Sequence, residues 1–372
     1  MLGVLEIAGR GSGFLRRREA SYLPTSGDVH VGEGLIRQFG LRTGDEIAGS
    51  VRPAAKGKSA SLDTITAVNG KPPELLRERT EFGRLGAVHP NDQLRLETAP
   101  DGSQPDFTNR VIDLLSPLGK GQRALIVAPA KAGKTMVLQA IAQGVNRNYP
   151  NADLFILLVD ERPEEVFEME AAGVGEVVAS SFDNPAQRHV AVAELILERA
   201  RRRVEQGDDV VLIVDSLTRL ARAYNTVEKG TGRTLSGGLD AQSLEKPKRF
   251  LGSARKIDPA QGGGSLTIIA TALVDTGSKM DQVIFEEFKG TGNSEVVLSR
   301  ELADRRVFPA IDLVASATRR EELLLGEEAL AASRLLRQRI AGMTPINAMN
   351  DLLTDMRRHK TNKELIQALT AD

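Results

Sequence analysis

Cysteine and tryptophan are both absent from the 372-residue sequence. Without cysteine, the chain can form neither a disulfide nor a metal site with thiolate ligands. No apolar run approaches the roughly 20 residues that span a bilayer, and the first residues lack the basic segment and apolar core of a signal peptide. We therefore expect a cytoplasmic protein that makes no contact with a membrane.

Aromatic residues and net charge are also scarce. Aromatic side chains make up 4% of the chain, and its formal net charge is −1. A broad surface for stacking nucleic-acid bases is therefore not expected, and attraction to a phosphate backbone must come from a local basic patch. The histidines lack the spacing of metal ligands, so we predict no histidine metal site at His30, His89, His189 or His359.

The remaining composition is that of a globular protein, 41% hydrophobic and 27% charged, with a length that suits two or three domains. Residues 1–98 contain short segments in which apolar and polar side chains alternate, the period of half-buried strands. Five such segments in this length predict a small closed barrel of the OB type. The segments are 4–7, 13–16, 28–31, 45–51 and 61–68.

A different pattern follows the barrel. Residues 99–105 have the composition of a linker, and we expect the linker region to cover 99–118. Beyond it, runs that are apolar on both faces alternate with helical stretches, which predicts a doubly wound α/β domain over 119–372 with a helical tail. The runs lie at 124–128, 154–159, 210–214 and 266–273. A ligand site is expected where these strands end.

One helix of this domain is clear from its periodicity. Val190, Ala193, Leu197, Ala200 and Val204 recur at spacings of three and four, the pattern of an amphipathic helix. Its arginines are predicted to lie mostly on or beside the solvent-exposed face rather than at a ligand site. These are Arg199, Arg201, Arg202 and Arg203.

The segment Ala128-Pro-Ala-Lys-Ala-Gly-Lys-Thr135 joins one apolar run to a helix-like run. A strand, a tight loop and a helix that starts with Gly-Lys-Thr hold nucleotide phosphates in P-loop proteins, although the pattern has Gly where this chain has Ala128. The N–H groups at the helix start face the anion, Lys134 adds positive charge, and the Thr135 hydroxyl is placed to hold Mg²⁺. The predicted ATP-binding residues are Pro129, Ala130, Lys131, Ala132, Gly133, Lys134, Thr135 and Met136.

Hydrolysis of ATP also requires a carboxylate near Mg²⁺ and a group that orients the attacking water. Asp215 ends the run 210–214 and suits the contact with Mg²⁺, although capping of the following helix would also explain it. Asp160 and Glu161 follow the run 154–159. A carboxylate there could polarise the attacking water, or Asp160 could cap the next helix and Glu161 could be a solvated acid.

Several other features each have two explanations. Arg319 could stabilise the transition state across a subunit boundary, or it could belong to a charged helix surface. The loops 229–238 and 275–281 could grip a phosphate backbone, or they could be surface turns. Phe14 could stack on a base or pack in the core, and the arginines at 16–18 could then contact phosphates.

Taken together, these segments resemble the bacterial Rho family of transcription termination factors, which are ring-shaped hexameric RNA-dependent ATPases and 5′-to-3′ helicases. The resemblance runs from about residue 3 to the end of the chain. The family's P-loop also lacks the first Gly, so Ala128 fits it. The motifs are Leu125-Ile-Val-Ala-Pro-Ala-Lys-Ala-Gly-Lys-Thr135, Asp160-Glu-Arg-Pro-Glu-Glu-Val166, Asp215-Ser-Leu-Thr-Arg-Leu-Ala-Arg-Ala-Tyr-Asn225, Asp275-Thr-Gly-Ser-Lys-Met280 and Arg306-Val-Phe-Pro-Ala-Ile-Asp312.

The resemblance implies catalytic roles for single residues. Glu161 would position the attacking water, and Asp215 would be the acid near Mg²⁺. Arg162 and Arg219 would lie at the nucleotide interface, and Arg319 would act on the nucleotide of the neighbouring subunit.

The resemblance also implies binding roles. Phe308 would stack on adenine, and Lys279 would contact RNA in a central channel together with the loop 230–239. On the barrel, Phe14, Arg16 and His30 would bind RNA. Within the loop, the expected RNA contacts are Arg233, Thr234 and Gly237.

The N-terminal part departs from the family pattern. The chain begins at the barrel, where the family usually carries a helical subdomain first. A pair of aromatic residues is reduced to Phe14, His30 stands where a tyrosine is expected, and an aromatic residue near 58–61 is missing. Stacking contributes roughly 1–3 kcal/mol per base, so we expect a weaker or altered preference for pyrimidine-rich RNA.

We therefore predict a homohexameric, RNA-dependent ATPase and helicase that uses ATP and Mg²⁺. It has an OB-type barrel and a RecA-like domain, moves on nascent single-stranded RNA and acts on the RNA polymerase elongation complex. A related P-loop ring, such as a rotary ATP synthase subunit or a DNA recombinase, is one alternative, but it fits the two basic loops poorly. The other is a nucleic-acid-binding ring that is not a motor, against which the set of Lys134, Glu161, Asp215 and Arg319 argues.

Overall fold

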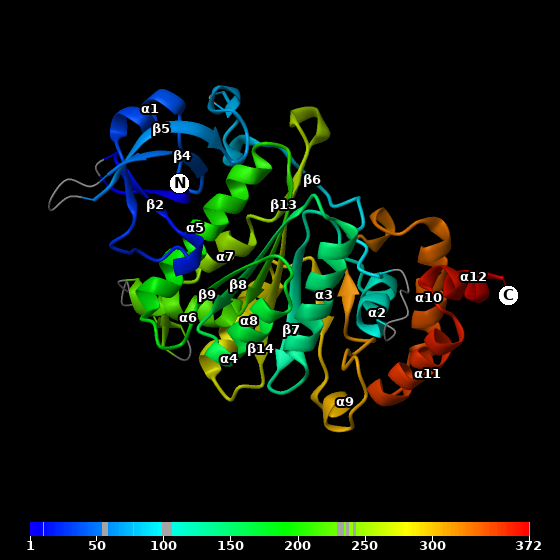
Figure 1. Cartoon of the computed structure of the whole chain (residues 1–372). Coiled ribbons are helices and arrows are strands. Elements are labelled where there is room, and N and C mark those ends of the chain that lie inside the picture. Colours follow the sequence, from blue (N-terminus) through cyan, green and yellow to red (C-terminus); the bar gives the residue numbers. More distant parts are fainter. Residues whose placement is uncertain are drawn as a thin grey trace.

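The computed structural model describes every residue except 10, 54–58, 77, 99–105, 229–233, 236–237, 241–242 and 372. Its N-terminal part is a closed five-stranded barrel with strand order β1-β2-β3-β5-β4 (Figure 1). Successive side chains of a strand point to opposite faces, and Leu5, Leu15 and Val31 accordingly fill the barrel core. The structure confirms the predicted barrel. Its elements are β1 (Leu2–Ile7), β2 (Gly13–Arg16), β3 (Val29–Val31), α1 (Glu33–Phe39), β4 (Glu46–Arg52) and β5 (Ser61–Val68).

The second part is built on a large sheet with strand order β16-β15-β7-β14-β10-β8-β9, in which the strands from β15 to β9 run parallel. Strands β7, β8, β10 and β14 are buried on both faces, as the apolar runs predicted. The strands are β7 (Arg123–Pro129), β8 (Asp153–Val159), β9 (Glu176–Ser180), β10 (Asp209–Asp215), β14 (Ser265–Val274), β15 (Ser294–Val297) and β16 (Ala317–Thr318), with β13 (Arg255–Ile257) and β6 (Ala87–Val88) added beside β14. A separate pair is formed by β11 (Thr234–Leu235) and β12 (Leu239–Asp240).

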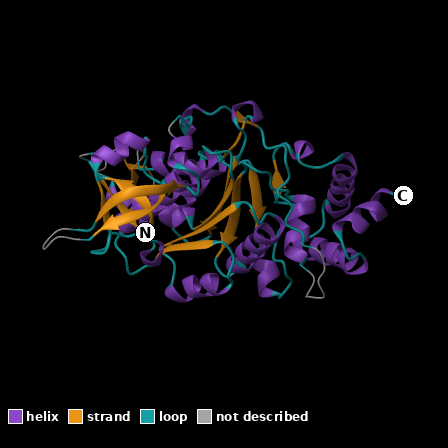
Figure 2. Cartoon of the chain, turned by 45° about the horizontal axis from the view of Figure 1, so that its top comes forward, coloured by secondary structure: helices purple, strands orange, loops and turns teal. Residues whose placement is uncertain are grey.

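Helices cover both faces of the sheet, and each face has its own hydrophobic core. One face is covered by α2 (Phe107–Leu115), α3 (Lys134–Asn148), α4 (Pro163–Ala171), α9 (Arg300–Asp304), α10 (Glu327–Ile340), α11 (Pro345–Arg358) and α12 (Asn362–Thr370). The other is covered by α5 (Ala186–Val204), α6 (Leu217–Val227), α7 (Glu245–Leu251) and α8 (Lys279–Lys289). Short 3-10 helices lie at Arg18–Ala20, Pro73–Leu76, Phe82–Arg84, Pro259–Gln261 and Glu321–Leu323. The barrel and the C-terminal helices lie at opposite ends of the molecule (Figure 2).

The expected boundary at residue 98 and the expected linker at 99–118 differ from the structure. Phe82 and Leu85 already pack into one core of the α/β domain, and Leu94 and Leu96 pack into the other. Helix α2 lies inside the expected linker and is largely buried. The barrel therefore ends near Leu76, and the chain after it is part of the α/β domain. Residues 99–105, which prompted the linker prediction, lie outside the described residues.

Helix α5 is where the barrel meets the α/β domain. The Arg199 side chain is 9% exposed, and its Nη2 lies 2.6 Å from Glu46 Oε2 of β4. Its Nη1 lies 2.5 Å from Glu176 Oε1 of β9 and donates to the hydroxyl of Tyr22. Arg202 is buried as well. The prediction of a solvent-exposed arginine face is wrong for these two residues, because the barrel covers that side of α5 and carboxylates neutralise the guanidinium groups. Arg201 and Arg203 remain partly exposed.

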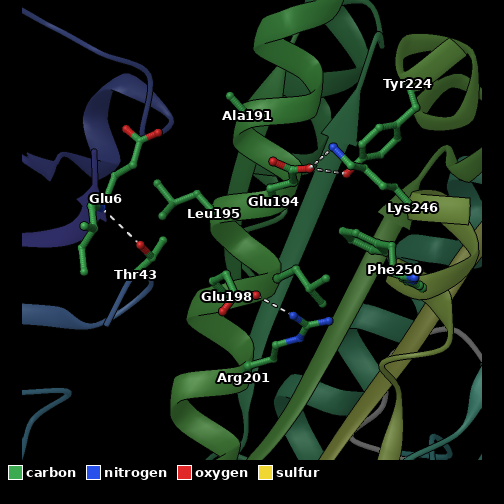
Figure 3. Close-up of a pocket in the computed structure, with 13 residues that line it drawn as sticks. Glu6, Thr43, Ala191, Glu194, Leu195, Glu198, Arg201, Tyr224, Lys246 and Phe250 are labelled. Carbon is green, nitrogen blue, oxygen red and sulfur yellow. Dashed lines mark hydrogen bonds and ion pairs between the residues drawn. The ribbon is translucent and has the colours of Figure 1, made fainter. Parts of the chain in front are cut away.

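Close backbone contact fixes the same interface. Gly44, in the turn before β4, has a φ of 93°, and a Cβ there would lie 2.4 Å from the carbonyl carbon of Glu198 in α5. Only glycine fits so close to another backbone. A cavity of about 460 Å³ lies beside this contact, between Glu6 and Thr43 of the barrel and the helices α5 and α7 (Figure 3). Two ion pairs lie within its lining, Glu198 with Arg201 at 2.5 Å and Glu194 with Lys246 at 3.9 Å.

Candidate nucleotide site and RNA-contacting residues

The loop between β7 and α3 has the backbone shape of a phosphate cradle. Lys131 and Gly133 have φ values of 64° and 86°, and α3 begins at Lys134. The N–H groups of the first turn are therefore presented at the end of the loop, where an anion is favoured. Ala128 lies inside β7, in register with Leu273 of β14. An extended strand position needs no glycine, which explains why alanine is accepted there.

The other predicted nucleotide-binding residues surround this loop. Phe308 is half-buried, and its ring lies 3.6 Å from the point that a Cβ on Gly133 would occupy. The structure therefore brings the predicted adenine-stacking ring to the predicted phosphate loop, although the two are far apart in sequence. Around the loop, Pro129 and Ala132 are buried, Thr135 is half-buried, and Ala130 and Met136 are exposed.

Lys134 joins two carboxylates that come from the ends of β8 and β10. Its Nζ lies 2.7 Å from Glu161 Oε1 and 2.8 Å from Asp215 Oδ1. Burial opposes the charge on Lys134, but the two carboxylates outweigh burial and raise its pKa. Burial also raises the pKa of Asp215, against the effect of Lys134 and of the Thr271 hydroxyl, which donates to Asp215 Oδ1 over 2.7 Å. Lys134 thus contacts both of the predicted catalytic carboxylates.

A divalent cation fits the acidic side of this site. Carboxylate oxygens of Glu161, Glu165 and Asp215 lie within 4.8 Å of one another, and such hard oxygen donors suit Mg²⁺. Glu161 Oε2 is buried, and its described partner is the guanidinium of Arg219, 3.1 Å away. Of the predicted Mg²⁺ residues, Asp215 belongs to this group, and Thr135 directly follows Lys134 in the first turn of α3.

Two predicted arginines lie near Glu161 but differ in their contacts. Arg219, in the first turn of α6, places Nη1 3.1 Å from Glu161 Oε2 and donates to the backbone oxygen of Asp160. It therefore holds the acid in place. Arg162 is exposed at the start of α4.

Arg319 lies at the opposite end of the sheet from the phosphate loop. It follows β16, and its N–H donates to the backbone oxygen of Asn293 over 2.9 Å. The preceding residue, Thr318, pairs with Ser294 of β15. Ser294 in turn pairs with Ala124 near the start of β7. The Arg319 side chain is exposed and is not brought to the nucleotide site of its own chain.

The predicted RNA-binding residues of the barrel form one small cluster. Phe14 and His30 pair across β2 and β3 with their ring centroids 5.6 Å apart, in an edge-to-face arrangement. The Arg16 guanidinium lies 5.3 Å from the Phe14 ring centroid. However, its Nε lies 2.5 Å from Glu6 Oε2, and Nη1 donates to Asp28. Two carboxylates thus already neutralise the charge that would contact a phosphate.

The predicted RNA contacts in the two loops are only partly described. Lys279 is exposed at the first position of α8. Thr234 begins β11, and its side chain lies outside the description. Arg233 and Gly237 lie outside the described residues.

Sequence patterns missed several contacts of the site. Thr271, Glu165 and the pair of Arg222 with Asp281 were not singled out. Thr271 carries only a weak signal, because Ser265 and Thr267 also place hydroxyls in the same strand. The other two carry no local signal, since charged residues on helices are ordinarily solvated.

Comparisons with known proteins define the class first. Residues 1–74 match the RNA-binding domain of the Rho termination factor. Residues 108–318 match the nucleotide-binding domain of the ATP synthase alpha/beta family. The chain therefore combines an RNA-binding barrel with a P-loop ATPase domain. Among the described residues, no helix is both long and apolar enough to cross a membrane.

Relatives over the whole chain define the family. Transcription termination factor Rho from Haemophilus influenzae is 53% identical over 368 residues, which cover 99% of this chain and 87% of the relative. The proteins of the same name from Salmonella typhimurium and Escherichia coli K12 match equally well. The chain belongs to the Rho family of transcription termination factors. This confirms the resemblance drawn from the motifs and decides against the rotary ATP synthase alternative.

Solved structures agree with the fold. A prototypical ATPase from the type III secretion system of pathogenic bacteria has a TM-score of 0.58 at 25% identity, covering 70% of this chain and 82% of its own. The assembled ATPase EscN from the enteropathogenic E. coli type III secretion system has a TM-score of 0.61 at 23% identity, covering 86% and 78%. At this identity, the similarity to EscN is evidence for the fold alone. The shared fold includes the doubly wound ATPase domain.

Proposed function

We propose that this chain is an RNA-dependent ATPase and 5′-to-3′ helicase that translocates on nascent RNA and terminates transcription. The observation that carries the proposal is the position of Lys134, whose ammonium contacts Glu161 and Asp215 beside a phosphate-binding loop. Phosphoryl transfer needs these groups together, because its catalysis is positioning and charge stabilisation. Membership of the Rho family supplies the link to RNA.

Each residue of the site has a proposed part in hydrolysis. Lys134 and the first-turn N–H groups hold the phosphates. Mg²⁺, held by Thr135 and Asp215, would neutralise charge on the phosphates. Glu161, which Arg219 keeps in place, orients the attacking water.

A second subunit completes the proposed site. Arg319 would stabilise the transferring phosphoryl group of the neighbouring chain in a homohexamer, and Arg162 would lie at the nucleotide interface on the side of Glu161. The position of Arg319 at the far end of the sheet supports this arrangement, because the side chain is too short to reach the phosphate loop of its own chain.

RNA is proposed to bind in two places. The barrel cluster of Phe14, Arg16 and His30 would load single-stranded RNA, and Lys279 with the loop 230–239 would grip it in the channel. Loading is expected to be weak, because one ring pair offers few stacking faces and Arg16 is already ion-paired. The proposed setting is the cytoplasm, where the ring would meet the RNA polymerase elongation complex.

The test is the ATPase rate of the full chain without RNA and with poly(C) or poly(A) at fixed salt. Stimulation by RNA is expected, with a smaller advantage for poly(C) than a barrel rich in aromatic residues would give. Lys134→Ala should abolish turnover with every RNA while the far-UV spectrum stays unchanged. An ATPase that ignores RNA would overturn the proposal, and turnover at the normal rate in Lys134→Ala would overturn the assigned site.

A further inference from the structure

Helix α6 begins directly after Asp215 and extends away from the nucleotide site. Polar side chains recur along it every third residue, at Ser216, Arg219, Arg222 and Asn225. Residues three apart are neighbours on a helix surface. These side chains therefore follow one another along the length of α6, and each has a different partner.

The first contacts of α6 are with the catalytic groups. Ser216 caps the helix by accepting from the N–H of Arg219 over 3.2 Å. Arg219 holds Glu161 and the backbone of Asp160. The start of α6 is therefore fixed to the groups proposed to hydrolyse ATP.

One turn further on, α6 holds the root of the loop that carries Lys279. Arg222 donates through Nε to Asp281 Oδ1 over 2.7 Å and through Nη2 to Oδ2. The Asp281 side chain is 2% exposed, and the Thr276 hydroxyl donates to its Oδ2 over 2.6 Å. Helices α6 and α8 lie side by side (Figure 1). The Asp281 carboxylate therefore links Thr276, in the loop before α8, to α6. It accepts from Thr276 and from two nitrogens of Arg222.

The last contact of α6 is with the second loop. Asn225 Oδ1 accepts from the N–H of Asp240 and from the hydroxyl of Ser243, both over 3.0 Å. These two residues follow the segment 230–239. A single helix therefore contacts the catalytic carboxylate at its start and the roots of both predicted RNA loops further along.

We propose that Arg222 is a positioning residue that couples the RNA loop of Lys279 to the nucleotide site through α6. The proposal rests on the proposed RNA-dependent ATPase function and names the residue that transmits it. Arg222 touches neither nucleotide nor RNA in this scheme. It sets where Lys279 stands relative to Glu161, because its two donors fix both the distance and the orientation of Asp281.

An ion pair without this role predicts a different outcome from the same substitution. The Arg222 side chain is 44% exposed but that of Asp281 is only 2% exposed, so the loss of a purely structural pair would lower stability and leave the response to RNA untouched. A positioning role instead changes the RNA concentration needed for half-maximal ATPase activity and lowers the ratio of stimulated to unstimulated turnover. The dependence of ATPase activity on RNA concentration therefore distinguishes the two explanations.

The experiment compares Arg222→Met with Arg249→Met in the full chain. Arg249 is 74% exposed and pairs with Glu245 one turn away on the short helix α7, so it is a matched control for loss of an arginine. Arg222→Met is expected to raise the half-maximal RNA concentration about tenfold, the effect of losing one charge-assisted contact, whereas Arg249→Met should match the wild type. Thr276→Val should also raise the half-maximal RNA concentration, but by a smaller factor.

The outcomes are decisive in each case. A folded Arg222→Met protein with the wild-type RNA response would overturn the proposal. If that variant does not fold, Arg222→Lys decides, since it keeps the charge but loses the two-point geometry: a threefold or larger shift supports the positioning role, and no shift refutes it. Failure of the proposed function itself would be seen separately, as absence of RNA stimulation in the wild type.

Discussion

Replacing Arg199 with methionine should loosen the barrel from the α/β domain at a cost of about 3 kcal/mol, near the low end of what breaking a buried ion pair costs. Arg199 is the central group of a contact that includes Glu46 and Tyr22 from the barrel and Glu176 from β9. Methionine keeps much of the apolar stem. The substitution therefore removes the charge and its hydrogen bonds but little packing.

The magnitude follows from how far the partners are buried. The side chains of Arg199 and Glu176 are 9% and 13% exposed, and that of Glu46 is 26% exposed. Removing one member of a fully buried pair costs roughly 3–5 kcal/mol because the other charge is stranded, whereas an exposed pair contributes about 0–1 kcal/mol. Water can reach Glu46 after the change, which places the expected loss near the lower end of the first range.

The assay is urea unfolding of the full chain, with hydrogen exchange of the barrel amides followed in parallel. Arg199→Met should lower the midpoint clearly and speed exchange in β4. Arg249→Met, which removes an exposed i,i+4 pair, should change the free energy of unfolding by less than about 1 kcal/mol. Equal midpoints for the two variants would refute the claim that Arg199 fixes the barrel to α5.

Three other experiments test the site and the core. Thr271→Val removes the donor to Asp215 and should cost about 1.5 kcal/mol of stability in urea, since the acceptor is charged. Burial raises the pKa of Asp113 to about 7, so the stability that its protonated form provides should be lost as pH rises from about 4 through 7, by up to about 1.4 kcal/mol per pH unit. Asp113→Asn should lack this dependence, and a pH series of urea midpoints measures it. Lys134→Ala and Arg319→Ala should each be inactive alone but regain some RNA-stimulated ATPase activity when mixed; no recovery in mixed rings would argue against a shared site.

Much of the fold was predictable because its signals are local. The strands 154–159 and 210–214 read as buried from composition alone, and β8 and β10 lie there. The carboxyl ends of parallel strands meet at one edge of a sheet, and the pairing of β8 with β10 brings the two acids at their ends close together. The contact of Lys134 with Glu161 and Asp215 therefore follows from sequence order and topology.

The parts that sequence did not predict depend on which surfaces pack together. Leu94 and Leu96 alternate with polar residues just as barrel strands do, yet they pack in the core of the α/β domain. Arg199 reads as solvated because nothing in its own helix shows that the barrel covers it. The partners Arg222 and Asp281 are 59 positions apart. Periodicity within one element carries no information about such contacts.

The shape of the sheet bears on why one chain cannot complete the proposed site. The phosphate loop follows the carboxyl end of β7, whereas Arg319 lies near its amino end, beside the register of Ala124. From Ala124 to Pro129 the strand extends about 16 Å at its usual rise per residue, and an arginine side chain is much shorter than that. If Arg319 and Lys134 act on the same nucleotide, they must therefore belong to different subunits.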